Sequence, residues 1–233
     1  MFSKILIANR GEIAVRIIRA CKDMGILSVA VYSEADRDSL HVSLADESVC
    51  IGAAAAKDSY LNMKTVISAA VATGAQAIHP GYGLLSENAE FAELCKKCNI
   101  AFIGPSSDLI QKMGDKDAAR KVMRTAGVPV VPGCDIIKDE SLIEEKADEI
   151  GYPLLVKARA GGGGRGIRTV KSRDELKKAY KTASAEALSA FGDGAVYMEK
   201  YLSPVKHIEM QILCDKYGKV ICLGERECSR SEE

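Results

Sequence analysis

The sequence predicts an α/β protein, with a doubly wound, Rossmann-like N-terminal domain followed by a smaller α+β lobe. Over roughly the first hundred residues, apolar runs alternate with amphipathic segments, which is typical of a parallel sheet with helices on both faces. A connector rich in proline and glycine then follows at 128–133. Beyond it, two short apolar runs flank a glycine-rich stretch at 161–166, and this pattern predicts a second, separate unit.

The first three elements form a β-α-β unit. Lys4–Ala8 and Leu27–Tyr32 are apolar runs, and Gly11–Cys21 between them has apolar residues at helical spacing. Because a crossover of this kind joins parallel strands, a parallel sheet is expected. The turn at 9–12 contains one glycine, whereas a dinucleotide site needs Gly-x-Gly-x-x-Gly, so a dehydrogenase is disfavoured.

The alternation then continues, with strands expected at 47–51, 77–78 and 101–103 and helices at 62–73 and 88–97. The segment His79–Asn88 lies just past a strand, at the edge where open α/β sheets bind ligands. Turn-forming residues are expected there in any case. Taken alone, the residues favour a structural turn in which Ser86 or Asn88 caps the next helix.

Further elements are expected after residue 112. Helices are predicted at 115–126, 141–150 and 172–191, the last with Ser172 and Glu175 as capping residues, and strands at 154–157, 167–170 and 195–198. Alternating residues at 206–214, a turn at Gly218 and an apolar run to Gly224 predict a hairpin. A two-stranded piece is marginal alone, so the chain is expected to be a fragment or an unusually short form.

The glycine-rich stretch is the most informative feature of the sequence. The strand ending at Lys157 leads into a loop of small residues, whose backbone amides can approach an anion closely. Lysine and glycines together predict a clamp over a polyphosphate. No Gly-Lys-Ser/Thr follows, and the loop joins strand to strand, so neither a P-loop nor a dinucleotide fingerprint is indicated. A flexible linker is the alternative.

Composition narrows the function classes. The 32 Lys and Arg residues balance the 32 Asp and Glu residues, so neither a nucleic-acid partner nor a membrane surface is indicated. No apolar run is long enough to span a bilayer, and the N-terminus leads directly into a strand, so a cytoplasmic protein with reduced thiols is expected. Cys95 and Cys98 have the spacing of half a zinc site, but no second pair follows.

Six segments, in order along the chain, resemble signatures of the biotin carboxylase family within the ATP-grasp superfamily. The resemblance covers residues 1–227 and implies a pre-ATP-grasp N-terminal domain, an ATP-grasp lobe and an incomplete final ATP-grasp sheet. The segments are Ile5–Ala14, His79–Asn88, Phe102–Pro105, Met113–Lys116, Gly161–Gly166 and Met198–Leu202.

The resemblance implies ATP-dependent carboxylation of biotin on a biotin carboxyl carrier protein, with bicarbonate as carbon source and carboxyphosphate as intermediate. This is the first half-reaction of acetyl-CoA carboxylase in fatty acid synthesis. Implied cofactors are ATP and Mg²⁺, and the implied partners are carboxyltransferase subunits and a second copy of the chain. The implied division is 1–112 for the N-terminal domain, 113–133 for helix and connector, 134–202 for the lid lobe and 203–233 for the start of the last sheet.

The resemblance also implies roles for individual residues. Lys116 and Lys157 would bind the ATP phosphates, and His207 would reach the ribose. The flap would be Gly161, Gly162, Gly163, Gly164, Arg165 and Gly166; the adenine hinge would be Glu199, Lys200, Tyr201 and Leu202; the dimer contact would be Arg16, Arg19 and Asp23.

The C-terminus departs from the family pattern at Arg230–Glu233, where the family continues into a basic segment and a further sheet. The family's magnesium-binding carboxylates, its base and its bicarbonate-binding arginines are expected beyond this point. No catalytic or metal-binding residue is therefore assigned, and the chain alone is expected to lack turnover. Two alternatives remain: another ATP-grasp ligase, or a non-catalytic module for dimerisation or partner binding.

Overall fold

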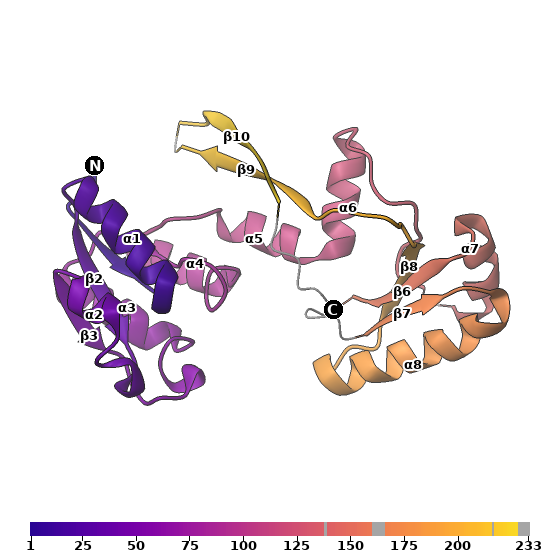
Figure 1. Cartoon of the computed structure of the whole chain (residues 1–233), viewed down its shortest axis with the longest axis horizontal. Helices are drawn as coiled ribbons and strands as arrows, with labels where there is room; N and C mark the ends of the chain where they lie inside the picture. Colours follow the sequence, from indigo (N-terminus) through magenta and orange to yellow (C-terminus); the bar gives the residue numbers. More distant parts are fainter. Residues whose placement is uncertain (138, 160–165, 216, 228–233) are drawn as a thin grey trace. The chain divides into compact units, whose positions relative to one another are not determined.

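The computed structural model describes residues 1–137, 139–159, 166–215 and 217–227, without the side chains of residues 116, 117 and 191. It divides into two compact units, Met1–Val128 and Pro129–Glu233 (Figure 1). The division falls within 113–133, the segment assigned from the sequence to a helix and connector.

The N-terminal unit is built on a five-stranded sheet with strand order β3-β2-β1-β4-β5. All of its neighbouring strands pair in parallel, as the β-α-β pattern predicted. The order reverses at β1, which therefore has β2 on one side and β4 on the other. The strands are β1 (Lys4–Ile7), β2 (Leu27–Tyr32), β3 (Glu47–Cys50), β4 (Ala77–His79) and β5 (Ala101–Phe102).

Helices cover both faces of this sheet, which confirms the doubly wound prediction. Ile5 and Ile7 of β1 pack with α1 on one face, whereas Leu6 packs with α3 and α4 on the other. Leu6 and Ile7 are fully buried, so β1 lies at the centre of both cores. The helices are α1 (Gly11–Asp23), α2 (Leu40–Leu44), α3 (Met63–Thr73), α4 (Ala89–Lys97), α5 (Ser107–Gly114) and α6 (Lys116–Thr125), with short 3₁₀ turns η1 (Glu34–Asp36) and η2 (Ala56–Asp58).

Helices α2 and α5 were not predicted from the sequence. The five residues of α2 are too few to show a helical period, and its buried side chain is the polar His41. Helix α5 begins at a capping serine, since Ser106 Oγ accepts a hydrogen bond from the Leu109 amide. The cap predicted for α4 is confirmed, because Asn88 Oδ1 accepts from the Phe91 amide at 2.8 Å.

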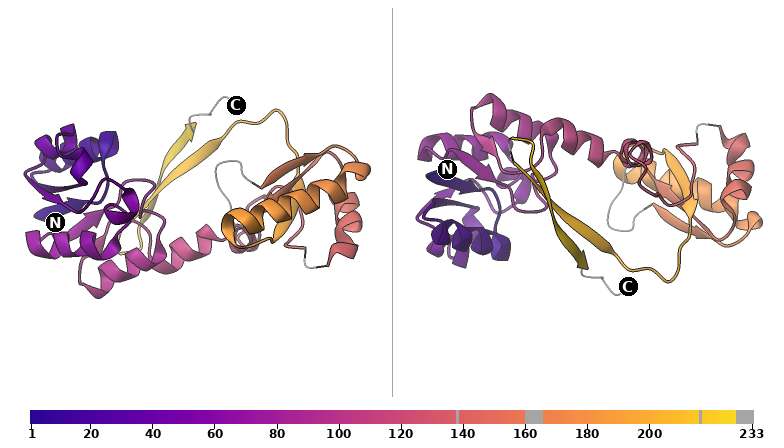
Figure 2. Two further views of the ribbon diagram at one scale, coloured as in Figure 1. Left: turned by 90° about the horizontal axis from the view of Figure 1, so that it is seen from below. Right: turned by 90° about the horizontal axis from the view of Figure 1, so that it is seen from above.

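The C-terminal unit contains a three-stranded antiparallel sheet of order β7-β6-β8, with α7 and α8 packed on one face (Figure 2). Gly133 in the connector pairs with Glu199 as an isolated bridge on the outer side of β8. The elements are η3 (Glu140–Leu142), α7 (Ile143–Ile150), β6 (Leu154–Ala158), β7 (Ile167–Val170), α8 (Arg173–Phe191) and β8 (Val196–Lys200).

The capping pattern predicted at the start of α8 forms only in part. Ser172 occupies the N-cap position, but its side chain makes no capping hydrogen bond. Glu175 instead accepts from the Lys171 amide at 2.9 Å, one residue before the cap. The predicted hairpin is confirmed as β9 (Ile208–Cys214) paired with β10 (Val220–Glu227), with an irregular register between Cys222 and Glu225.

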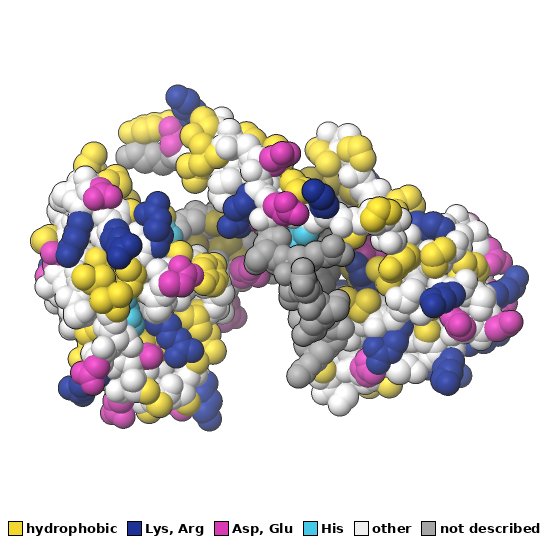
Figure 3. All heavy atoms as spheres, in the orientation of Figure 1, with side chains coloured by type: hydrophobic (Ala, Val, Ile, Leu, Met, Phe, Trp, Pro, Cys, Tyr) yellow, Lys and Arg dark blue, Asp and Glu magenta, His cyan; other side chains and the backbone are white. Residues whose placement is uncertain are grey.

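The distribution of charged side chains on the surface agrees with the equal numbers of acidic and basic residues in the sequence. Positive and negative side chains are interspersed over the visible face of each unit rather than gathered by sign (Figure 3). Within the described ranges, no helix combines the length and the hydrophobicity that crossing a bilayer requires.

Candidate functional site

The two faces of the β7-β6-β8 sheet carry different kinds of side chain. Leu154 and Val156 point into the core formed with α7 and α8, as do Val196 and Met198 from β8. Because side chains alternate along a strand, Lys157 lies on the opposite face, directly across from Tyr197. We call this opposite face the Lys157 face.

Lys157 forms an ion pair with Glu199 on this face. The two residues lie diagonally across β6 and β8, where Leu155 is opposite Glu199. Their side chains are 25% and 12% exposed, so the pair is only partly solvated and its attraction is less screened than that of a surface pair. The sheet therefore holds an ammonium group in a defined place beside the glycine-rich stretch.

Backbone hydrogen bonds close the hairpin that carries this stretch. The Ala158 amide donates to the Gly166 carbonyl at 2.9 Å, and the Arg159 amide donates to the Ala195 carbonyl at 2.8 Å. Gly166 has φ +72°, and a Cβ there would lie 2.8 Å from Ala158 Cβ, so this position requires glycine. The predicted flap residues Gly161, Gly162, Gly163, Gly164 and Arg165 lie outside the described residues.

The predicted hinge residues are divided between the two faces. Lys200 belongs with Val196 and Met198, and its ammonium donates to the Gly151 and Tyr152 carbonyls rather than to a group on the Lys157 face. Tyr201 and Leu202 follow β8 and are 38% and 48% exposed. His207 is exposed, immediately before β9, and Lys116 begins α6 in the other unit with its side chain outside the described part.

A magnesium ion does not fit the residues at hand. Among those that the structure describes, no group of three or more His, Cys, Asp or Glu side chains could hold a metal ion. Glu199, the carboxylate on the Lys157 face, is paired with Lys157. The described residues therefore do not form a complete magnesium site.

Family models match nearly the whole chain. Residues 1–110 match the biotin carboxylase N-terminal domain, and residues 115–232 match the ATP-binding domain of the carbamoyl-phosphate synthase L chain. The chain belongs to the biotin carboxylase family. The gap between the two matches, residues 111–114, lies in the second half of α5, whereas the compact units divide at Val128, so α6 belongs to the second match and to the first unit.

Individual relatives agree with this assignment. Biotin carboxylase 1 of Bacillus subtilis is 57% identical over 230 residues, covering 98% of this chain and 51% of that protein. The small subunit of 2-oxoglutarate carboxylase from Hydrogenobacter thermophilus is 54% identical, covering 98% of this chain and 48% of the subunit. The chain thus spans about half the length of the curated relatives it matches.

Solved structures of the family share the fold. A biotin carboxylase complex from Campylobacter jejuni has 52% identity and a TM-score of 0.92, covering 98% of this chain and 52% of that one. A biotin carboxylase domain dimer of the Hydrogenobacter thermophilus 2-oxoglutarate carboxylase, with MgADP, ADP and bicarbonate, has 53% identity and a TM-score of 0.89, covering 98% and 51%. These values confirm the ATP-grasp fold class predicted from the sequence.

In the biotin carboxylase N-terminal domain, Arg16, Arg19 and Asp23 are exposed on α1. The opposite face of the helix buries Ala14, Ile17, Ile18 and Cys21 in the core. The three charged residues therefore form a solvent-facing row, which is available to a partner but equally consistent with a hydrated helix surface.

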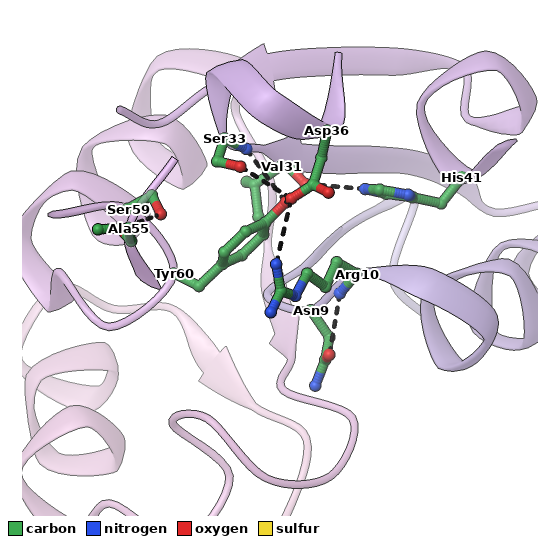
Figure 4. A network of polar contacts seen from close by, with 9 residues as sticks. All are labelled: Asn9, Arg10, Val31, Ser33, Asp36, His41, Ala55, Ser59 and Tyr60. Carbon is green, nitrogen blue, oxygen red and sulfur yellow. Dashed lines mark hydrogen bonds and ion pairs between the residues drawn. The ribbon is translucent and has the colours of Figure 1, made fainter. Parts of the chain in front are cut away.

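Asp36 centres a polar network in the same domain that the sequence did not predict (Figure 4). Its Oδ2 accepts from Ser33 Oγ at 2.8 Å and from the Tyr60 hydroxyl at 2.7 Å, and the Arg10 guanidinium lies 3.5 Å away and over the Tyr60 ring. Burial acts to raise the pKa of Asp36, but the hydrogen bonds from Tyr60 and Ser33, with Arg10, outweigh it and lower that pKa. Burial, followed by the Asp36 contact, raises the pKa of Tyr60 to about 12.

Replacing Asp36 with asparagine is expected to lower the free energy of unfolding at neutral pH and to have a smaller effect in acid. Because the pKa of Asp36 is lowered on folding, its contribution is complete above the ordinary value of 3.8 and is lost as pH falls through the folded pKa. Urea unfolding should show Asp36→Asn less stable by about 1–3 kcal/mol at neutral pH, with the difference shrinking below about pH 4. Asp38→Asn, at an exposed position nearby, is the control; a deficit that does not change with pH would contradict the assignment.

Side-chain hydrogen bonds from Asn9, in the turn between β1 and α1, hold the segment that follows β4. Asn9 is 5% exposed, and its Nδ2 donates to the Pro80 carbonyl at 2.7 Å and the Tyr82 carbonyl at 2.8 Å. Its Oδ1 accepts from the Arg10 amide at 2.9 Å. Gly81 has φ +66°, and a Cβ there would lie 2.7 Å from Asn9 Nδ2. Asn9 and Gly81 therefore give the His79–Asn88 motif a structural role.

Proposed function

We propose that this chain supplies the N-terminal domain and the nucleotide-covering lobe of a biotin carboxylase. The proposed reaction is ATP-dependent carboxylation of biotin on a carrier protein, with bicarbonate as carbon source, as the first half-reaction of acetyl-CoA carboxylase. The observation that carries this proposal is Lys157, fixed beside the glycine-rich stretch in a chain 57% identical to a named biotin carboxylase. The related dimer with MgADP and bicarbonate supports the same substrates.

In this proposal Lys157 binds phosphate oxygens and offsets the negative charge that is redistributed as the γ-phosphoryl group is transferred. Glu199 holds the ammonium in place before ATP arrives, and the phosphates then compete for it. Residues 161–166 close over the nucleotide and exclude water, which protects a carboxyphosphate intermediate from hydrolysis. Magnesium, when bound, would supply positive charge that offsets the charge of the phosphates, and the described residues contain no group of three or more His, Cys, Asp or Glu side chains that could hold it.

The other residue roles implied by the family are part of the same proposal. Lys116 is a second phosphate contact, the backbone of 199–202 receives the adenine, and His207 approaches the ribose. The functional division remains 1–112, 113–133, 134–202 and 203–233. A carrier protein, carboxyltransferase subunits and a second copy of the chain, contacted through Arg16, Arg19 and Asp23, are the proposed partners in the cytoplasm.

The decisive experiment measures ATP binding by calorimetry, and ATP hydrolysis with and without bicarbonate and free biotin. It compares this chain with a chimaera in which residues 1–227 are joined to the C-terminal half of the Bacillus subtilis relative. We expect the chain alone to bind ATP without turnover, and the chimaera to hydrolyse ATP in a bicarbonate-dependent reaction that biotin stimulates.

Other outcomes would favour the alternatives. Turnover by the chimaera that ignores biotin would indicate another ATP-grasp ligase. Absence of nucleotide binding by both proteins would indicate a non-catalytic module for dimerisation or partner binding. The relative's own full-length enzyme, assayed in parallel, is the positive control.

A further inference from the structure

Lys200 and Lys157 lie on opposite faces of the β7-β6-β8 sheet. Lys157 and Glu199 share the Lys157 face, while Lys200 follows Val196 and Met198 on the face that α7 and α8 cover. The family resemblance places Lys200 beside adenine. Its side chain, however, is directed to the side of the sheet away from the ammonium that would hold the phosphates.

The Lys200 ammonium is engaged at the end of α7. It donates to the Gly151 carbonyl at 3.1 Å and to the Tyr152 carbonyl at 2.9 Å. Gly151 ends the helix with φ +78°, and its amide donates to the Ala147 carbonyl. Carbonyls at a helix C-terminus lack partners within the helix and attract cations, so an ammonium group is well suited to this position.

Backbone hydrogen bonds attach the same short segment to its neighbours. The Lys200 amide donates to the Pro132 carbonyl at 2.7 Å, and the Tyr201 amide donates to the Pro153 carbonyl at 3.2 Å. The side-chain and main-chain bonds of Lys200 therefore join the end of β8 to two segments, the 151–153 turn and the connector. Without the ammonium, the bonds to the Gly151 and Tyr152 carbonyls would be lost. The hydrogen bond from the Tyr201 amide to the Pro153 carbonyl would then remain to attach the 151–153 turn to the end of β8.

We propose that Lys200 is a positioning residue, whose ammonium fixes the hinge at 199–202 against the turn after α7 so that the hinge backbone presents a preformed edge to the adenine. It does not read the base itself, because two of its three donors are bonded to the Gly151 and Tyr152 carbonyls and its side chain is directed to the face opposite Lys157. The inference deepens the proposed function and rests on nucleotide binding by this lobe. A preformed hinge reduces the entropy cost of ordering these residues on binding.

The test compares Lys200→Met and Lys200→Arg with the wild-type chain and with Lys178→Met, an exposed lysine on α8. Dissociation constants are measured for ATP and for two analogues, 7-deaza-ATP and 1-deaza-ATP. The first analogue lacks ring nitrogen N7 and the second lacks N1, the ring nitrogens to which a lysine could donate. Amide hydrogen exchange at Tyr201 is measured without nucleotide. We expect Lys200→Met to weaken all three nucleotides by the same factor, about tenfold, and to speed exchange at Tyr201.

Lys200→Arg should restore most of the affinity and protection, because a guanidinium can also donate to two carbonyls. A loss that spares one deaza analogue, while ATP and the other analogue are weakened, would overturn the proposal in favour of direct contact with the nitrogen that the spared analogue lacks. Unchanged affinity and unchanged exchange would also overturn it. If the wild-type chain binds no nucleotide, the proposed function fails, yet faster exchange at Tyr201 in Lys200→Met would still support the positioning role and unchanged exchange would refute it.

Discussion

Lys157→Met is expected to weaken ATP binding by about a hundredfold, the cost of removing one preorganised charged group from a phosphate site. Methionine keeps the apolar stem of the side chain, so packing against the sheet is retained while the ammonium is lost. Glu199, which is 12% exposed, would also lose its ion-pair partner. Titration with ATP, followed by calorimetry, measures the change directly.

Two variants separate the role of Lys157 from a general effect of charge. Lys178→Met removes a lysine from the exposed surface of α8 and should leave ATP affinity within about twofold, because an exposed charge far from a ligand is screened by salt. Glu199→Gln should leave Lys157 available to the phosphates and so reduce affinity far less than Lys157→Met. Equal losses in the two lysine variants would argue against a phosphate site at Lys157.

Most of the fold could be predicted because its elements carry strong local patterns. Segment 11–21 has a clear helical period, and 27–32 is apolar except for Ser28, as expected for a strand buried on both faces. Both became elements of the N-terminal unit, with α1 extending to Asp23. Helix α2 could not be predicted, because five residues span little more than one turn.

The position of the candidate site along the chain could be proposed from the sequence, but the direction of its side chains could not. Lys157 ends a strand beside glycines, and that arrangement alone indicates an anion site. The face on which Lys200 lies could not be predicted, since Val196, Tyr197 and Met198 are all apolar and hide the period of two that would separate the faces. Only the register with β6, in which Tyr197 lies opposite Lys157, shows which residues share a face.

The polar contacts of the N-terminal unit were also beyond prediction from sequence, because they join residues far apart along the chain. Tyr60 reaches Asp36 across 24 positions, and Asn9 reaches Tyr82 across 73. A partial signal existed: Asn9 and His79–Asn88 both follow strands, and parallel strands bring their carboxyl ends to one edge. The identity of each donor and acceptor depends on the tertiary arrangement.

Asn9→Asp is expected to destabilise the N-terminal unit by about 3–5 kcal/mol at neutral pH. The substitution keeps the size of the side chain but replaces a buried amide donor with a carboxylate oxygen facing the Pro80 and Tyr82 carbonyls. Urea unfolding followed by circular dichroism measures the change. Because asparagine and aspartate cap helices equally well, Asn88→Asp at the start of α4 is a matched control and should be nearly neutral.

The pH dependence of Asn9→Asp tests the cause of the destabilisation. Burial against two carbonyls would raise the pKa of the introduced carboxyl on folding, so the folded state binds more protons than the unfolded state and its stability increases as pH falls. The protonated acid can also donate one of the two lost hydrogen bonds. The deficit relative to wild type should therefore shrink on acidification, whereas a constant deficit would indicate a steric cause and would contradict the donor role of Asn9.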